Sequence, residues 1–298
     1  MEVVNSSDKK HVTIFFTLTI AWTWLFWGIP ALESNGLISL PMSSDIFTAL
    51  GGLGPLLVAL PLTYATRGKE GIIKLVKRGA DFRFEKKWWI PLIFLIPVIF
   101  LVSYFMVGLV QIVPALDLMR FLNRFPLQFV YFFFGVAVAE EFGWRGYALD
   151  RLQTSFQNYR YTAVISSVVL GIVWGFWHLP FFYTAGTSQA GWSFWLFLWL
   201  TVMVSILFTW LYNNTNGSVL TALIFHTTLN LCVNFVPIFL IHFYYPSLTT
   251  DFAFIVVNIL TTAFVMIVVV YWGPKNLAQS RRKQIDVQSE VTLMQKKE

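Results

Sequence analysis

Residues 126–150 read PLQFVYFFFGVAVAEEFGWRGYALD, a long apolar run that ends in two glutamates and an arginine. The run is long enough to enter a lipid bilayer, because about 20 helical residues cross a hydrocarbon core of roughly 30 Å. A charged side chain in hydrocarbon costs about 2.5–3.5 kcal/mol on insertion scales, so such residues usually face the interior of a bundle and mark function. The stretch therefore predicts a membrane-spanning helix that carries part of a polar site.

The composition of the whole chain agrees with a membrane location. Of its 298 residues, 57% are hydrophobic and 12% are charged, whereas soluble domains carry about 25% charged residues. Its 30 Phe and 13 Trp are typical of segments that lie at a bilayer interface. The single cysteine, Cys232, excludes an intramolecular disulfide and a cysteine metal cluster. We predict an all-α, polytopic integral membrane protein.

Eight apolar segments are long enough to span a membrane, and they divide the chain into one domain and two tails. The spans cover approximately residues 12–33, 46–66, 88–112, 126–149, 162–185, 192–213, 216–239 and 252–273. We expect residues 1–11 to be a cytoplasmic N-terminus and 12–273 to form a single intramembrane domain. Residues 274–298 are expected to be a basic, disordered cytoplasmic tail.

The lysines and arginines predict the orientation of these spans. With both termini in the cytoplasm, 18 of the 21 basic residues lie in inner segments, Arg120 and Arg124 lie in an outer loop, and Arg145 lies inside the fourth span. This is the asymmetry of the positive-inside tendency. It predicts a multi-pass protein of the cell membrane, and it explains the net charge of +6 by anionic lipid headgroups, without a nucleic-acid partner.

Few ionisable residues lie inside the spans, and they come from three different helices: Glu140, Glu141, Arg145, His178 and His226. Glu141 and Arg145 are four residues apart, so they share a helix face and can pair, while Glu140 lies about 100° around the helix. A buried structural ion pair and two helix-bridging histidines are the alternative to a functional reading. Because the five residues occur together, we favour a functional site.

Two neighbours complete the set. Asn230 follows His226 by four residues on the same helix face, and Trp174 precedes His178 by four. Gly171 and Gly175 permit another helix to approach the fifth span closely.

The residue types fit the hydrolysis of a carbonyl compound. A carboxylate and a histidine can together draw a proton from water, and a second histidine and an amide can donate hydrogen bonds to an oxyanion. The spans contain no Gly-x-Ser-x-Gly and no pair of aspartates. Glu140, His178 and His226 are alternatively three ligands of a catalytic zinc ion with an open fourth position, although the sequence lacks His-Glu-x-x-His.

Three motifs in order resemble those of a known protease family. EEFGWR at 140–145 is similar to its Glu-Glu-x-x-x-Arg motif, and WGFWHLP at 174–180 to its Phe-x-x-x-His motif, with Trp174 at the first position. HTTLN at 226–230 is similar to His-x-x-x-Asn, and GGLGPLLVAL at 51–60 to a Gly-Pro feature of an earlier helix. The chain, over residues 126–239, thus resembles the type II CAAX prenyl proteases of the CPBP or Abi family, which includes bacteriocin-processing and immunity proteins.

The resemblance implies an eight-helix intramembrane endopeptidase that cuts a membrane-associated peptide or protein, prenylated or not. It implies that Glu140 and His178 activate the attacking water and that His226 and Asn230 stabilise the oxyanion. The resemblance also implies that Glu141 and Arg145 order the site. We expect no cofactor, with Zn²⁺ as the alternative. Trp174 and Trp177 are expected in the wall of a water-filled cavity.

Helix depth predicts that this cavity opens to the cytoplasm. At about 1.5 Å per residue, Glu140 and His226 lie roughly 13–15 Å from the cytoplasmic ends of their spans, although His178 lies near 24 Å. Two other function classes remain open at this point. One is a non-catalytic immunity or scaffold protein, and the other is a transporter that uses Glu140 and Glu141 as a proton relay.

Overall fold

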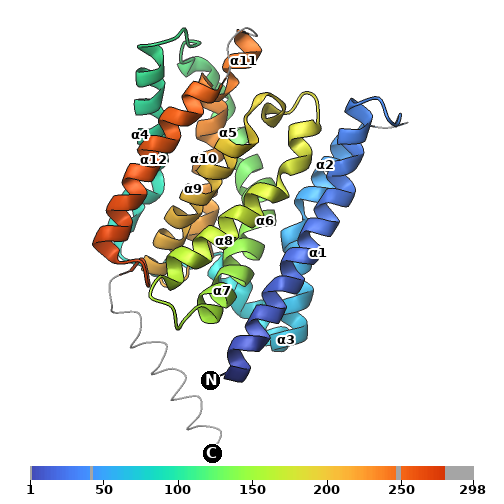
Figure 1. The fold of residues 1–298 in the computed structure, drawn as a ribbon, viewed down its shortest axis with the longest axis vertical. Helices are drawn as coiled ribbons and strands as arrows, with labels where there is room; N and C mark the ends of the chain where they lie inside the picture. The colour runs from blue at the N-terminus through green and yellow to red at the C-terminus, as the bar shows by residue number, and fades with distance from the viewer. Residues whose placement is uncertain (1, 41–42, 246–249, 279–298) are drawn as a thin grey trace, which may run out of the picture.

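The computed structural model describes residues 2–40, 43–245 and 250–278, and every regular element in these ranges is a helix. The helices form a single bundle (Figure 1). The α-helices are α1 Glu2–Ser34, α2 Asp45–Gly52, α3 Gly54–Arg78, α4 Trp89–Gly108, α5 Leu118–Val130, α6 Val138–Gly143, α7 Asp150–Ser155, α8 Thr162–Trp177, α9 Phe194–Asn214, α10 Val219–Phe235, α11 Ile241–Tyr244 and α12 Asp251–Trp272. Short 3₁₀ turns are η1 Lys86–Trp88, η4 Leu179–Tyr183, η5 Ser188–Gly191 and η6 Pro237–Leu240, and π-helical segments are η2 Tyr131–Ala137 and η3 Trp144–Leu149.

The number of membrane spans agrees with the sequence. Among the described residues, seven helices are long and apolar enough to cross a membrane, and the bent pair Val219–Phe235 and Pro237–Tyr244 makes an eighth if it is one span. Its 52° bend falls beside Pro237, which lacks the N–H that would continue the helix. The prediction of an all-α bundle with about eight spans is confirmed.

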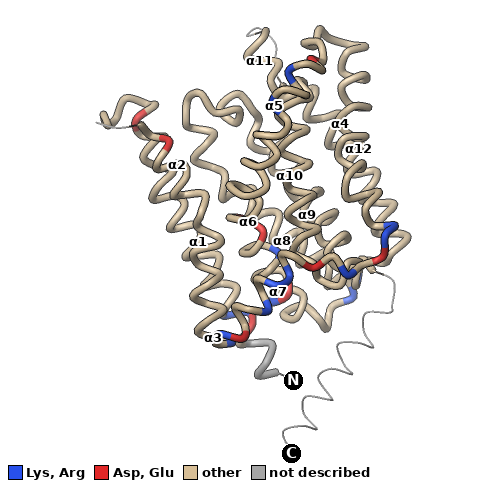
Figure 2. Tube along the Cα trace, turned by 180° about the vertical axis from the view of Figure 1, so that it is seen from behind, with Lys and Arg blue, Asp and Glu red and all other residues tan. Residues whose placement is uncertain are grey.

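The two ends of the bundle differ in what they carry. The start of α1 and the end of α12 lie at one end, which we call the terminal end, together with residues 79–88, 156–161 and 215–218 (Figure 1). The other end, which we call the distal end, carries residues 35–40, 109–117, 179–193 and 236–245 (Figure 1). Lysines and arginines gather toward the terminal end (Figure 2).

The fourth span, Leu118–Ser155, is one long run of helix with two π-helical segments inside it. It begins at Leu118, before the expected residue 126. Asp117 is the N-cap, and its Oδ1 accepts the backbone N–H of Arg120 at 2.8 Å. The π-helical segments flank α6, which carries Glu140 and Glu141. Such wide turns occur frequently at functional sites, and here they lie directly before and after the turn that carries the two carboxylates.

The fifth span runs obliquely across the bundle and packs against α9 (Figure 1). A Cβ atom added at Gly171 would lie 2.7 Å from Val202 Cα, so the close approach expected at this glycine is confirmed. α8 ends at Trp177, before the expected end of the fifth span at 185, and a 3₁₀ turn that contains Pro180 continues the span to Tyr183, because proline lacks the N–H that would continue an α-helix. His178 is therefore the C-cap of α8 and lies at the end of the helix.

Two polar segments outside the expected spans are folded. α3 continues to Arg78 across a break at Gly68, whose φ of 60° suits glycine, so residues 69–78 are helical. At the other terminus, the N–H of Ala163 donates to the carbonyl of Lys275 at 3.0 Å, and Leu277 is fully buried. Residues 274–278 are thus folded, and residues 279–298 of the expected tail lie outside the described residues.

Candidate active site

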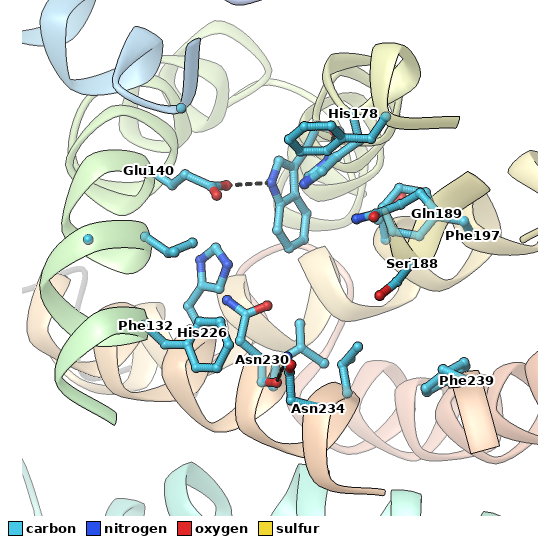
Figure 3. A pocket seen from close by; sticks show the side chains of 18 of the residues that line it. Phe132, Glu140, His178, Ser188, Gln189, Phe197, His226, Asn230, Asn234 and Phe239 are labelled. Atoms are coloured by element: carbon cyan, nitrogen blue, oxygen red, sulfur yellow. Dashed lines mark hydrogen bonds between the residues drawn. The ribbon is translucent and has the colours of Figure 1, made fainter. Parts of the chain in front are cut away.

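A cavity of about 970 Å³ brings together side chains from three separate spans. Glu140 on α6, His178 at the end of α8, and His226 and Asn230 on α10 all line it (Figure 3). Trp174 and Trp177 also lie in its wall. The four residues singled out for catalysis therefore face one space, although they are spread over 91 positions of the sequence, counting from 140 to 230.

Glu140 is held by two indole groups. Its Oε2 accepts a hydrogen bond from Trp174 Nε1 at 2.8 Å and another from Trp144 Nε1 at 3.3 Å. The residue is only 4% exposed, and donors of this kind compensate for the loss of water around a buried carboxylate. Because both indoles use Oε2, Oε1 is available to a water molecule in the cavity.

His178 has a defined ring orientation. Its Nδ1 lies 2.8 Å from the carbonyl oxygen of Trp174 in the last turn of α8. Since a carbonyl can only accept, Nδ1 carries the proton and the neutral ring keeps its lone pair on Nε2. Edge-on contacts with Trp177 and Phe197, at ring-centre distances of 4.7 and 5.3 Å, fix the plane of the ring.

Glu141, Arg145 and His226 form a buried charged cluster behind the cavity. Arg145 Nη1 donates to both oxygens of Glu141 at 2.8 and 2.9 Å, and His226 Nδ1 lies 2.7 Å from Glu141 Oε1. Glu141 and Arg145 are both fully buried. The guanidinium carbon of Arg145 lies 3.7 Å from the ring centre of Phe208, a cation–π contact. The cluster fixes the imidazole of His226 through its Nδ1 and leaves Nε2 for the cavity.

Asn230 supplies a hydrogen-bond donor without an acceptor. Its Nδ2 is buried and has no partner within the described residues. Its backbone carbonyl accepts Asn234 Nδ2 at 3.0 Å. A buried amide N–H₂ left without a partner is costly, so this group is ready to bind an oxygen atom of a molecule in the cavity.

Trp174 connects these groups more closely than its expected place in the cavity wall implies. Besides donating to Glu140, its ring centre lies 5.6 Å from that of His226 and 5.8 Å from that of His178. Sequence reasoning did not identify Trp144 as the second donor to Glu140, although the two are four residues apart. It also did not identify the polar lining residues Ser188, Gln189 and Asn234, which carry no motif.

The cavity opens at the distal end, away from the termini, whereas helix depth predicts an opening to the cytoplasm, the side on which the termini are expected. Its lining includes Asp45 and Ala49 of α2 and Leu127 and Tyr131 of the fourth span, all exposed. Toward the terminal end, fully buried aromatic side chains close the space. Phe15 packs against Trp144 and Tyr147 there, at ring-centre distances of 5.5 and 5.1 Å.

The arrangement does not match a three-ligand metal centre. Over the described residues, no group of three or more His, Cys, Asp or Glu side chains is placed to hold a metal ion. Glu140 Oε2 accepts an indole N–H and His178 Nδ1 donates to a carbonyl oxygen. Glu140 Oε1 and His178 Nε2 are the atoms that these contacts leave toward the cavity.

Comparison with known proteins shows a similarity to one family. Residues 122–232 match the sequence profile described as type II CAAX prenyl endopeptidase Rce1-like. The chain is also similar to a protein named CAAX prenyl protease 2 from Methanococcus maripaludis. The two are 27% identical over 243 residues, which cover 76% of this chain and 85% of that relative. The matched residues 122–232 include all three motifs, at 140–145, 174–180 and 226–230. Over these residues the chain is therefore similar to the Rce1-like type II CAAX prenyl endopeptidases.

Proposed function

We propose that this protein is an intramembrane endopeptidase that hydrolyses a peptide bond with a water molecule activated by Glu140 and His178. One observation carries the proposal: Glu140, His178, His226 and Asn230, from three different spans, line a single cavity. Similarity to a family described by its endopeptidase activity supports the same conclusion.

In the proposed reaction, the attacking water lies between Glu140 and His178. Glu140 Oε1 accepts one O–H of the water and takes its proton, while His178 Nε2 accepts the other O–H. The water oxygen bonds to the carbonyl carbon of the substrate, and the carbonyl oxygen becomes an oxyanion. When the C–N bond breaks, Glu140 returns the proton to the leaving amine nitrogen. No covalent bond to the enzyme forms.

His226 and Asn230 are proposed to stabilise the oxyanion. Asn230 Nδ2 is a donor without an acceptor, and a protonated His226 donates from Nε2 while its Nδ1 proton faces Glu141. Preorganised donors of this kind are each worth about 10²–10³ in kcat. Glu141 and Arg145 act as positioning residues, because they hold the ring of His226 and lie behind the wall.

The substrate is proposed to be an apolar or aromatic segment of a membrane-associated peptide or protein. The wall combines polar groups with large rings, among them Trp27, Phe181, Trp192 and Phe197, a lining that suits apolar side chains. Among the described residues it contains no lysine or arginine, so apart from the protonated His226 at the oxyanion position a free carboxylate of the substrate would find no cation there. We therefore propose cleavage at a bond within a chain.

The test compares membrane peptides from cells that produce the wild-type protein with those from cells that produce the Glu140→Ala variant. We expect cleavage products that are present with the first and missing with the second. The same peptides, added to purified protein in liposomes, should be cut before and after extensive chelation of divalent metals. Loss of cleavage on chelation, restored by Zn²⁺, would replace the proposed mechanism with the metal-dependent one. An inactive variant that keeps the cellular phenotype would indicate a binding protein.

A further inference from the structure

The side of the membrane from which the cavity is reached follows from two independent features of the structure. The first is the position of the opening. Ser188 and Gln189, in the turn η5 at the distal end, line the cavity together with Asp45 at the start of α2. All three belong to segments that lie far from the termini (Figure 1).

The opposite side of the site is closed by packing. Between Glu140 and the terminal end, the side chains of Trp144, Arg145 and Tyr147 are fully buried. Phe15 of α1 is also fully buried and packs against Trp144 and Tyr147. A peptide cannot pass through an interior packed at the density of an organic crystal without displacing these rings. Substrate therefore reaches the site from the distal end, or from the lipid beside it.

The second feature is the distribution of charge. At the distal end the described basic residues are Arg120 and Arg124, both on α5 (Figure 2). The acidic residues there are Glu33, Asp45, Asp117 and Asp251. The terminal end carries thirteen described basic residues: Lys9, Lys10, Arg67, Lys69, Lys74, Lys77, Arg78, Arg83, Lys86, Lys87, Arg151, Arg160 and Lys275.

Lysines and arginines in short loops favour the cytoplasmic side of a membrane, and anionic headgroups of the cytoplasmic leaflet attract them. From these two features we infer that the cavity opens on the extracytoplasmic face of the membrane. Its substrate is then an exported peptide, or an extracytoplasmic segment of a membrane protein. The reaction that supplies this substrate is a translocation step, which must precede the cleavage. The substrate class rests on the proposed function, whereas the orientation of the cavity does not.

Single added cysteines test the orientation without any need for activity. The native Cys232 is buried, so the wild-type protein is the unlabelled control. Ala185→Cys is an exposed distal position, Ser188→Cys reports on the cavity mouth, and Gln157→Cys is an exposed terminal position. Each variant is treated with a membrane-impermeant maleimide, in intact cells and after the cells are permeabilised.

We expect Ala185→Cys and Ser188→Cys to react equally in intact and permeabilised cells, and Gln157→Cys to react only after permeabilisation. Labelling of Gln157→Cys in intact cells would overturn the inference, whether or not the distal positions also react. So would a Ser188→Cys thiol that reacts only after permeabilisation or not at all.

The same labelling in the Glu140→Gln background separates this inference from the proposed function. If the cysteines are labelled as expected but the protein with native Glu140 cleaves no peptide, the inferred orientation of the cavity stands and the proposed protease function is wrong. If cleavage is found, the cut bonds should map to extracytoplasmic segments of their substrates. Cut bonds in cytoplasmic segments would contradict the substrate class even if the protease activity is real.

Discussion

The buried ion pair between Glu141 and Arg145 provides a quantitative test of the site. We consider Arg145→Met, which keeps the length of the side chain and removes its charge. The change leaves the Glu141 carboxylate fully buried without the two Nη1 contacts of 2.8 and 2.9 Å. Removing one partner of a buried pair costs about 3–5 kcal/mol, because an uncompensated charge remains. At roughly 2–4 °C per kcal/mol, the melting temperature should fall by about 6–20 °C.

A double variant distinguishes the charge from packing. Arg145 Nε and Nη2 have no partners among the described side chains, so the pair is itself incompletely satisfied and its joint removal should be much less costly. We expect Glu141→Gln combined with Arg145→Met to recover at least half of the lost stability. It should not recover activity, because a neutral amide would no longer hold a protonated His226.

The assay is thermal unfolding of the purified protein in detergent, together with cleavage of a peptide in liposomes. Lys87→Met is the matched control, since Lys87 pairs with Glu85 at 2.8 Å on the exposed surface, where such pairs contribute about 1 kcal/mol or less. A melting temperature of Arg145→Met within about 2 °C of wild type would refute the reasoning. A double variant no more stable than Arg145→Met would do the same.

Three further changes should have distinct effects. Trp174→Phe removes the N–H that donates to Glu140 at 2.8 Å, and a hydrogen bond to a charged group is worth about 1.5–3 kcal/mol. We therefore expect kcat to fall roughly 10- to 150-fold while KM changes little. An unchanged kcat would exclude a role of Trp174 in holding Glu140. Asn230→Ala should lower kcat by about 10²–10³ in the same assay without a loss of thermal stability, and a purely structural role predicts the reverse. Gly143→Ala would place a Cβ 2.7 Å from Pro55 O, and overpacking of this kind costs about 1–3 kcal/mol. Thermal unfolding should therefore show a lower melting temperature for Gly143→Ala. Gly28→Ala is the control, because the space around Gly28 is open, and its melting temperature should not change.

The sequence predicts the spans well because hydrophobic length is a local property. Each of the eight apolar segments corresponds to a helix or a helix run, and the larger differences are the later end of α3 at Arg78, the earlier start of α1 at Glu2 and the earlier start of the fourth span at Leu118. The Glu141–Arg145 pair follows from helical spacing in the same way. The π-helical segments on either side of α6 have no simple signal in the sequence, although they flank the turn that carries Glu140.

The direction of the cavity was not predictable from depth along a helix. Counting residues gives the distance of Glu140 from the end of its span, but it does not tell which end is filled with side chains. Phe15 closes the terminal side by packing on Trp144 and Tyr147, and these contacts join residues about 130 positions apart. The apparent excess depth of His178 has a related cause, because α8 crosses the bundle obliquely and ends at Trp177 (Figure 1).

Trp144 shows what pattern reasoning can overlook. It follows Glu140 by four residues, the same spacing that identifies Glu141 and Arg145 as a pair. An indole in an apolar run is usually interpreted as packing, yet its N–H needs an acceptor when it is buried. Searching for such donors four residues from each intramembrane carboxylate would have found this contact.

The cleavage rate of the Glu140→Gln variant in liposomes tests the central claim most directly. Glutamine keeps the shape of the side chain and its acceptor for the two indoles, but it cannot take a proton from water. Glu70→Gln, at an exposed position of α3, is the matched control. Loss of a general base predicts a rate about 10²–10⁴ lower than wild type, with an unchanged rate for Glu70→Gln. A Glu140→Gln protein that cleaves within about threefold of the wild-type rate would contradict water activation by Glu140, since a lost base costs at least about a hundredfold.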